Sequence, residues 1–149
     1  MDTHEGKPDL GRVKVYIVSP TRALLIRDRR FSDALCKLSG GHIESGDHTK
    51  SDDDGVIATA IREVREETGV ELFPEEVELV WNEFGLDGIH YDPYFCVARV
   101  TEEKLDTREE IGNENGSPIE TVIVNRAEIL TMPDLLEDHR PFIRKIEGY

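Results

Sequence analysis

The sequence has few cysteines, no long apolar run and no basic stripe. Cys36 and Cys96 are too few for a disulfide framework, and neither lies in a CxxC or Cys/His cluster, so we expect both to be small buried apolar residues. No apolar run approaches the roughly 18 residues that a membrane span needs. The first 14 residues are polar and lack the apolar core of a signal peptide, so we expect a cytoplasmic location.

Positive charge is also scarce. The 32 acidic residues outnumber the 18 basic ones, and the formal net charge is −14. A protein that binds a nucleic-acid backbone would show a basic stripe, so we expect no such binding. A small anionic substrate is compatible with this charge only if cations or a metal ion offset the repulsion locally.

The 149 residues fit one domain, with residues 1–10 as a flexible N-terminal tail and residues 11–149 as the domain. Apolar alternation and turn residues predict strands at 12–18, 23–27, 34–38, 77–84, 94–100 and 119–124, the first two forming a hairpin. Helical spacing and proline placement predict helices at 55–68, 130–138 and 141–146. This order predicts a mixed sheet covered by helices.

The remaining segments are expected to be turns and loops. Residues 39–41 should end the third strand, and residues 42–54 should form a polar loop whose last aspartates can cap the helix at 55. Residues 85–93 should be a turn and residues 105–117 an acidic loop. Gly69 stands where the residue after a helix belongs.

Three glutamates gather on the helix at 55–68. With 100° per residue and Glu63 at zero, Glu67 lies at about 40° and Glu66 at about −60°. The apolar stripe falls at roughly 60–160°, so the acidic patch borders it. Carboxylates at such an edge are partly shielded, and a cation gains more there. Taken alone, the pattern is also typical of an ordinary helix surface, with Arg62 pairing with Glu66 one turn away.

Adjacent glycines upstream favour a metal site over that ordinary surface. Gly40 and Gly41 let the backbone approach a ligand closely and expose carbonyl oxygens as hard donors. Magnesium prefers oxygen ligands and shares them with substrate phosphates, whereas the nitrogen and sulfur ligands typical of zinc are missing here. The segment is therefore expected to bind Mg²⁺, with Mn²⁺ as an alternative.

These residues resemble the Nudix box, G-x5-E-x7-R-E-U-x-E-E-x-G-U, where U is a bulky aliphatic residue. Eight of its nine fixed positions match: Gly41, Arg62, Glu63, Val64, Glu66, Glu67, Gly69 and Val70. The box spans residues 41–70, about a fifth of the chain. The resemblance implies an α/β fold in which a mixed, curved β-sheet is sandwiched between helices.

The resemblance also implies an activity and a set of roles. The activity is metal-dependent hydrolysis of the diphosphate bridge in a nucleoside diphosphate linked to another moiety. Glu63, Glu66, Glu67 and the Gly40 carbonyl would be metal ligands. Glu63 would also act through a metal-bound water, and Arg62 would orient the glutamates and balance their charge. Gly41 would lie against the substrate.

The chain departs from the box at its first acid. Counting forward from Gly41 gives Asp47, whereas counting back from Arg62 gives Asp54, because the chain carries seven extra residues between the two halves. We favour Asp47 as the acid that supports the site by pairing with Arg62, which leaves Asp54 as a helix cap. Ser39 stands where many members have proline, a change expected to affect loop stiffness more than chemistry.

Further candidates lie outside the box. Glu109, Glu110 and Glu114 precede the last strand, and Glu114, between glycines and asparagines, is our candidate for an additional catalytic acid; a solvated acidic loop is the alternative. On the substrate side, Arg27 could contact a phosphate and Tyr94 a base. Tyr94 and Phe95 face opposite sides of their strand, and the sequence does not tell which side is core.

Two functions remain open at this point. The first is the pyrophosphohydrolase, acting on a small nucleotide-like substrate, favoured because all three box glutamates are present. The second is a non-enzymatic Nudix-like domain that binds a nucleotide or regulates a partner, favoured by the insert. The sequence identifies neither the substrate nor the oligomeric state, and a homodimer is compatible with it.

Overall fold

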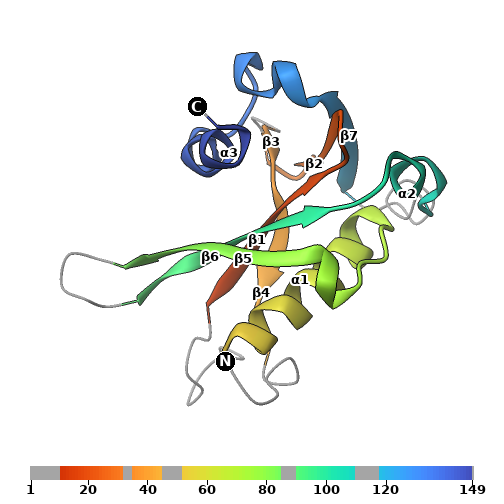
Figure 1. Cartoon of the computed structure of the whole chain (residues 1–149). Coiled ribbons are helices and arrows are strands. Elements are labelled where there is room, and N and C mark those ends of the chain that lie inside the picture. Colours follow the sequence, from red (N-terminus) through yellow and green to blue (C-terminus); the bar gives the residue numbers. More distant parts are fainter. Residues whose placement is uncertain (1–10, 32–34, 45–51, 85–89, 110–117, 149) are drawn as a thin grey trace.

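The computed structural model describes residues 11–31, 35–44, 52–84, 90–109 and 118–148, and the tail expected at 1–10 lies outside them. The strands form one mixed sheet with the main order β3-β2-β1-β6-β5 (Figure 1). β1 (Arg12–Val18) is central, antiparallel to β2 (Arg22–Asp28) and parallel to β6 (His90–Arg99). β5 (Val77–Phe84) pairs antiparallel with β6. The hairpin predicted for the first two strands is confirmed.

β1 shares its length between two antiparallel partners. Its first half pairs with β4 (Ser39–His42) and its second half with β2. β2 pairs in turn with β3 (Cys36–Lys37) and, along its whole length, with β7 (Ile119–Asn125). The sheet therefore branches at β1, and β4 has no second strand partner in the part of the chain that the structure describes.

Helices cover both faces of the sheet. α1 (Asp52–Thr68) packs on one face and α3 (Arg140–Glu147) on the other (Figure 1). The α1-side core is contiguous from α1 to β1 and includes Val13, Val15, Ile17, Val56, Ala60 and Val64. The α3-side core includes Tyr16, Val18, Leu25, Leu38, Phe142 and Ile143. The predicted α/β sandwich is confirmed.

Both faces of β6 are core, which settles the question left open by the sequence. Tyr94 and Cys96 belong to the α1-side core, whereas Phe95 and Val97 belong to the α3-side core. Cys36 and Cys96 are both buried and unbridged, as predicted.

The α3-side core is centred on aromatic rings. Phe95 packs 4.8 Å from Phe142 between ring centroids, and Trp81 lies 5.7 Å from Phe95. His139 meets Phe95 edge-on, and its Nδ1 accepts a hydrogen bond from the Leu38 N–H at 3.1 Å. Burial lowers the pKa of His139 to about 3, so this histidine is a neutral acceptor that fastens the α3 region to the sheet.

The glycine pair continues the sheet rather than ending it, so the expectation that residues 39–41 stop a strand is wrong. Gly40 and Gly41 lie within β4, and Gly40 stands opposite Lys14 of β1. A Cβ on Gly40 would lie 1.8 Å from the Val13 carbonyl oxygen. Glycine is used here because only its bare backbone lets β4 run this close to β1.

α1 is longer than predicted at its first end. It begins at Asp52, so Asp54 lies in its first turn and is not its cap, contrary to the expectation. The end is as predicted: Gly69 adopts φ +79°, and its N–H bonds the Arg65 carbonyl at 3.0 Å. The left-handed backbone of Gly69 turns the chain out of the helix.

Two other segments differ from expectation. Part of the predicted acidic loop is α2 (Glu102–Thr107), capped by Thr101, whose hydroxyl accepts from the Lys104 N–H at 3.1 Å. The helix predicted at 130–138 is replaced by two short 3₁₀ turns, η3 (Arg126–Thr131) and η4 (Glu137–His139). Arg140 donates to the carbonyls of Leu130 and Met132, which ties the start of α3 to the end of η3.

The remaining helix and strand boundaries agree closely with those predicted from the sequence. The 3₁₀ turn η2 (Pro74–Glu76) leads into β5, and α3 has proline in its first turn, as predicted. β6 begins at His90, inside the predicted turn at 85–93, of which residues 85–89 lie outside the described residues. Among the helices that the structure describes, none is long and apolar enough to cross a membrane.

Candidate metal and catalytic site

Glu67 joins the last turn of α1 to β4. Its Oε1 accepts hydrogen bonds from the Ser39 hydroxyl at 2.7 Å and from the Gly40 N–H at 2.9 Å. Burial raises the pKa of Glu67, while these two donors act in the opposite direction. The carboxylate is therefore fixed in position but poorly solvated, so it gains from a nearby cation.

Glu63 lies one turn earlier, directly against Gly41. A Cβ on Gly41 would lie 2.4 Å from the Glu63 carboxyl carbon, so the missing side chain makes the room that the carboxylate occupies. The Glu63 side chain is only 16% exposed. Burial raises its pKa, and the adjacent Arg62 partly offsets this. Any larger residue at position 41 would displace Glu63.

Arg62 connects the glutamates to β4. Its Nη2 donates to Glu63 Oε1 and to the His42 carbonyl, both at 3.0 Å. Its Nη1 lies 3.7 Å from Glu44, and its Nε lies 4.0 Å from Glu66. The helical pair with Glu66 is thus the longest of these contacts. Arg62 acts mainly on Glu63 and on the strand, unlike an ordinary surface arginine.

The Gly40 backbone faces away from β1. Its N–H bonds Glu67, so Gly40 and Lys14 form a pair without mutual backbone hydrogen bonds. Both backbone groups of a strand residue point to the same edge, so the Gly40 carbonyl also lies on the side of Glu67. A neutral oxygen donor thereby stands beside the carboxylates.

The donor set fits a hard divalent cation. It consists of three carboxylates and one carbonyl, all oxygen donors, and two of the carboxylates are poorly solvated. Glu66 is different, because its side chain is 59% exposed. Within the described ranges, no three acidic, histidine or cysteine side chains already converge closely enough to hold an ion. Holding one would require Glu66 to turn inward.

A comparison with protein-family models identifies the domain. The NUDIX domain model matches residues 10–146, which is nearly the whole chain. The chain belongs to the Nudix family. Membership confirms the class expected from the box, a Nudix-type hydrolase that acts on phosphoanhydride bonds. A comparison with curated protein sequences found no match.

Solved Nudix structures share the fold at low identity. A MutT structure, from work on the Aliivibrio salmonicida and Vibrio cholerae proteins, is 14% identical with a TM-score of 0.66, covering 93% of this chain and 96% of that one. A Nudix-family hydrolase of Clostridium perfringens is 16% identical with a TM-score of 0.58, covering 93% and 95%. The Nudix domain of Shewanella oneidensis NrtR, solved with ADP ribose, is 18% identical with a TM-score of 0.61, covering 99% and 92%.

The structure brings together only part of the predicted Nudix site. Arg27 lies on the opposite face of β2 from α1, where its guanidinium donates to Cys36 Sγ at 3.2 Å and to Asp134 at 2.8 Å. Tyr94 is 9% exposed and packs in the α1-side core. Asp47 and Glu114 lie outside the described residues.

Three features of the site were missed by the sequence analysis. The Ser39 hydroxyl holds Glu67, Glu44 lies beside Arg62, and the His42 carbonyl accepts from Arg62. A serine in place of proline was a visible signal at position 39, because proline has no hydroxyl. A backbone carbonyl leaves no signal in a sequence.

Glu109, one of the three late acids considered, lies near the site. The missing Cβ of Gly69 would meet the Glu109 carbonyl at 1.5 Å, so the chain after α2 crosses the end of α1 here. Glu109 shares a surface hollow with Glu66 and Arg65. Of the late acids, it is the one that the described structure locates beside the box.

Proposed function

We propose that this Nudix domain is a magnesium- or manganese-dependent hydrolase of the diphosphate bridge in a nucleoside diphosphate linked to another moiety. The observation that supports it best is the pair Glu63 and Glu67. Both carboxylates are fixed beside the glycine strand, and burial raises the pKa of each. Enclosing two acids in this way is unfavourable unless positive charge compensates them, and a bound cation supplies that charge.

The contacts support the following proposed roles. Glu63, Glu66, Glu67 and the Gly40 carbonyl would hold the metal ion, which supplies charge neutralisation for the phosphates and an acidified water as nucleophile. Arg62 favours the ionised form of Glu63 through the hydrogen bond to Oε1 and ties α1 to β4 through the His42 carbonyl. Gly41 leaves space for the carboxylate and for a phosphate at the backbone.

Turnover of a substrate panel tests the proposal. The protein is incubated with nucleoside diphosphate derivatives and with canonical and oxidised nucleoside triphosphates, in Mg²⁺ or Mn²⁺, and phosphate products are measured. We expect turnover that chelator abolishes and that Glu66→Gln lowers at least about tenfold. Glu128→Gln, which changes an exposed acid on η3, should leave the rate unchanged. Turnover that survives both chelator and Glu66→Gln would contradict the metal mechanism.

The non-enzymatic alternative is tested by the same panel. The NrtR Nudix domain was solved with ADP ribose, which shows that this fold accommodates such a ligand in that protein. If this chain binds a panel member yet releases no phosphate product under any metal, the binding function replaces the hydrolase.

The first acid of the box is tested separately. We propose that Asp47 supports the site through Arg62, so Asp47→Asn should lower the rate more than Asp54→Asn. The reverse order would transfer the role to Asp54, which lies in the first turn of α1.

The additional acid also has its own test. Glu114 is our candidate for that role, and alanine at Glu109, Glu110 and Glu114 in turn should lower the rate most at Glu114. Unchanged rate and metal dependence in all three variants would remove a late-loop acid from the mechanism.

A further inference from the structure

A surface hollow lies beside the end of β2 and β3, and an exposed aromatic ring is part of its lining. Its lining consists of Asp28, Phe31, Leu35, Lys37 and Leu136. Phe31 is 58% exposed, and the Lys37 ammonium lies 5.1 Å from the centre of its ring. Phe31 belongs to neither core cluster, so its ring can contact a ligand in the hollow.

The hollow opens on the same face of the sheet as the box glutamates. Cys36 and Leu38 point into the α3-side core, so Lys37 and Ser39 point to the α1 side. Ser39 does contact Glu67 there. In β2, Leu24 belongs to the α1-side core, and Asp28 shares its direction because the two are an even number of residues apart.

The hollow and the carboxylates are also close. Lys37 precedes Gly40 by three residues of extended chain, so their Cα atoms are at most about 10 Å apart. This is the scale on which a nucleotide places its base relative to its phosphates. One small molecule can therefore contact both places.

A fixed positive charge stands within reach of both. Arg30 donates two hydrogen bonds to Asp28, from Nε to Oδ1 at 3.0 Å and from Nη2 to Oδ2 at 2.7 Å. Its side chain is 67% exposed, and its pKa is raised mainly by the hydrogen bonds to Asp28, with a smaller contribution from the charge of Glu67. Arg30 thus offers a guanidinium to an anion that lies between the hollow and α1.

We propose that Phe31 stacks on the nucleobase of the substrate in this hollow, while Arg30 faces the phosphates that reach the glutamates. The inference rests on the proposed function, because it assigns the base-binding part of the same site. An aromatic side chain presents a flat apolar face that every base can cover, which makes Phe31 a determinant of affinity for nucleosides over other phosphorylated compounds.

The chain provides a matched control in Phe73. This residue is also 58% exposed and also lies under a lysine, with the Lys104 ammonium 4.6 Å from its ring centre. It precedes η2, next to α2, and Lys104 is already held by Glu76 at 2.7 Å. Phe31→Ala and Phe73→Ala therefore each remove one equally exposed phenylalanine ring, but only the first lies in the hollow.

The test measures binding by calorimetry in Mg²⁺, with each of the four nucleoside monophosphates and with ribose 5-phosphate as the probe that lacks a base. We expect Phe31→Ala to weaken binding of the best nucleoside monophosphate about tenfold, from the loss of base stacking. Phe31→Tyr and Phe73→Ala should bind it like the wild type, and ribose 5-phosphate should bind all four proteins equally.

Three results would overturn the inference: wild-type affinity in Phe31→Ala, an equal loss in Phe73→Ala, or no binding of any nucleoside monophosphate to the wild type. Failure of the hydrolase proposal looks different, because it appears as a lack of turnover in the panel. If Phe31→Ala weakens binding of the nucleoside monophosphate and the panel shows no turnover, the base site is supported and the hydrolase is rejected. If the panel shows turnover and Phe31→Ala binds like the wild type, the hydrolase is supported and the base site is rejected.

Discussion

Glu67 is more deeply buried than Glu63, and β4 provides both of its donors. A buried carboxylate with hydrogen-bond donors can stay ionised, whereas one without them would take up a proton. Ser39 therefore does more than shape the strand, because its hydroxyl favours the ionised form of a proposed metal ligand and opposes the effect of burial.

Removing that hydroxyl should destabilise the metal-free protein. We expect Ser39→Ala to lower the free energy of unfolding by about 1.5–3 kcal/mol, the usual range for a hydrogen bond to a charged group. Urea denaturation in chelator measures this. The control is the same substitution in a Glu67→Gln background, where the loss should be smaller. Equal losses in the two backgrounds would show that Ser39 acts independently of Glu67.

Single residues differ in how far the sequence could reveal them. Glu63, Glu66 and Glu67 could be proposed as a group because a helix fixes their angles relative to the apolar stripe. Arg27 was a weaker inference, since alternation in a strand separates two faces without saying which one carries the site. The structure places Arg27 on the face away from α1, against Asp134.

At the scale of elements, the end of α1 carries a tight crossing. Gly69 has φ +79°, and the chain that follows α2 passes directly over it, with the Glu109 carbonyl where a Cβ would be. Gly148 ends α3 with a similar φ of +89° but has nothing within 4 Å of that position. Comparing substitutions at the two glycines therefore distinguishes the energetic cost of a left-handed backbone from the cost of a steric collision.

Alanine at these positions should have unequal effects. Gly148→Ala carries only the left-handed backbone penalty of about 1–2 kcal/mol. Gly69→Ala adds a collision with backbone, so we expect it to cost clearly more and to lower the rate by shifting α2 relative to α1. Urea denaturation of both variants compares them. An equal cost would mean that the crossing adjusts without strain.

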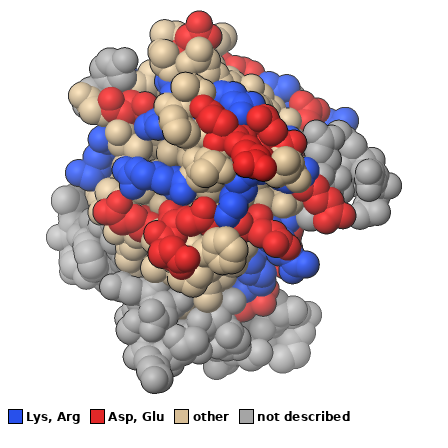
Figure 2. Space-filling view, turned by 45° about the vertical axis from the view of Figure 1, so that its right-hand side comes forward, with Lys and Arg blue, Asp and Glu red and all other residues tan. Residues whose placement is uncertain are grey.

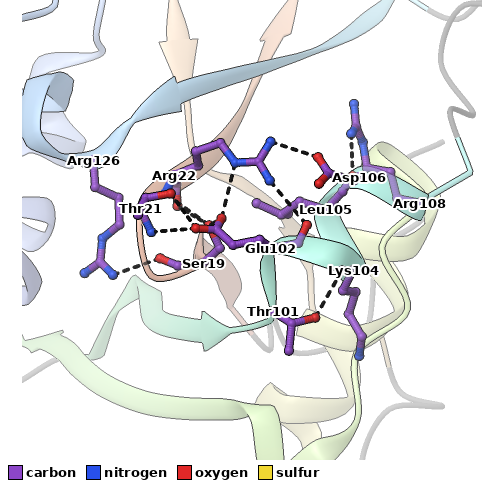
Figure 3. Close-up of polar contacts among 10 residues, drawn as sticks. All are labelled: Ser19, Thr21, Arg22, Thr101, Glu102, Lys104, Leu105, Asp106, Arg108 and Arg126. Atoms are coloured by element: carbon purple, nitrogen blue, oxygen red, sulfur yellow. Dashed lines mark hydrogen bonds and ion pairs between the residues drawn. The ribbon is translucent and has the colours of Figure 1, made fainter.

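α2 is anchored to the β1–β2 turn by one carboxylate. Glu102 accepts hydrogen bonds from the hydroxyls of Ser19 and Thr21, from the Thr21 N–H at 3.1 Å and from Arg22 Nε at 3.2 Å (Figure 3). These donors, the Ser19 hydroxyl foremost, lower the pKa of Glu102 to about 2. Arg22 also donates a hydrogen bond to Asp106, so the turn holds α2 through two acidic residues, Glu102 and Asp106.

The anchor gives stability a defined pH dependence. A carboxyl whose pKa is lowered on folding stabilises the protein above its ordinary pKa of 4.5, and this contribution is lost as the pH falls towards 2. Glu102→Gln should therefore lower the urea midpoint at pH 7, and the gap to the wild type should shrink by pH 3. Glu103→Gln, one residue on and exposed, should show no such gap. A gap that is constant with pH would contradict the role of charge.

At the scale of the whole molecule, the surface charge is mixed. Figure 2 shows acidic and basic side chains interspersed over one face, and the described residues drawn there form no continuous basic surface. The expectation that the protein does not bind a nucleic-acid backbone rests on composition and stays a prediction. The two arginines with proposed roles at the site, Arg30 and Arg62, are each paired with a carboxylate, Asp28 and Glu63 respectively.

The two cores should unfold together, because they share one sheet. Trp81, the only tryptophan, reports on the α3 side through Phe95 and Phe142. The circular dichroism of helices is dominated by α1 on the other face, since α1 is the longest helix described. We expect the fluorescence and dichroism transitions in urea to coincide. Separate midpoints would show that one layer can leave the sheet while the other stays folded.

The sequence predicted where strands and helices lie better than it predicted which strands pair with one another. β1 and β5 match their predicted bounds because apolar alternation is local information. β4 was missed, since two glycines normally end a strand and only the approach to β1 makes them strand residues here. α2 was missed because its six residues bury a single leucine, Leu105, which is too little for a helical period to show.

The pairing of β1 has a consequence for how the protein is made. Val13 of β1 pairs with Tyr94 of β6, and Leu24 of β2 pairs with Ile123 of β7, so the central contacts join residues about 80 and about 100 positions apart. β1 therefore has both edges paired only after β6 has been made, and β2 only after β7. Both strands wait for partners that are distant in the sequence, which favours slow folding and leaves them exposed to mispairing during synthesis.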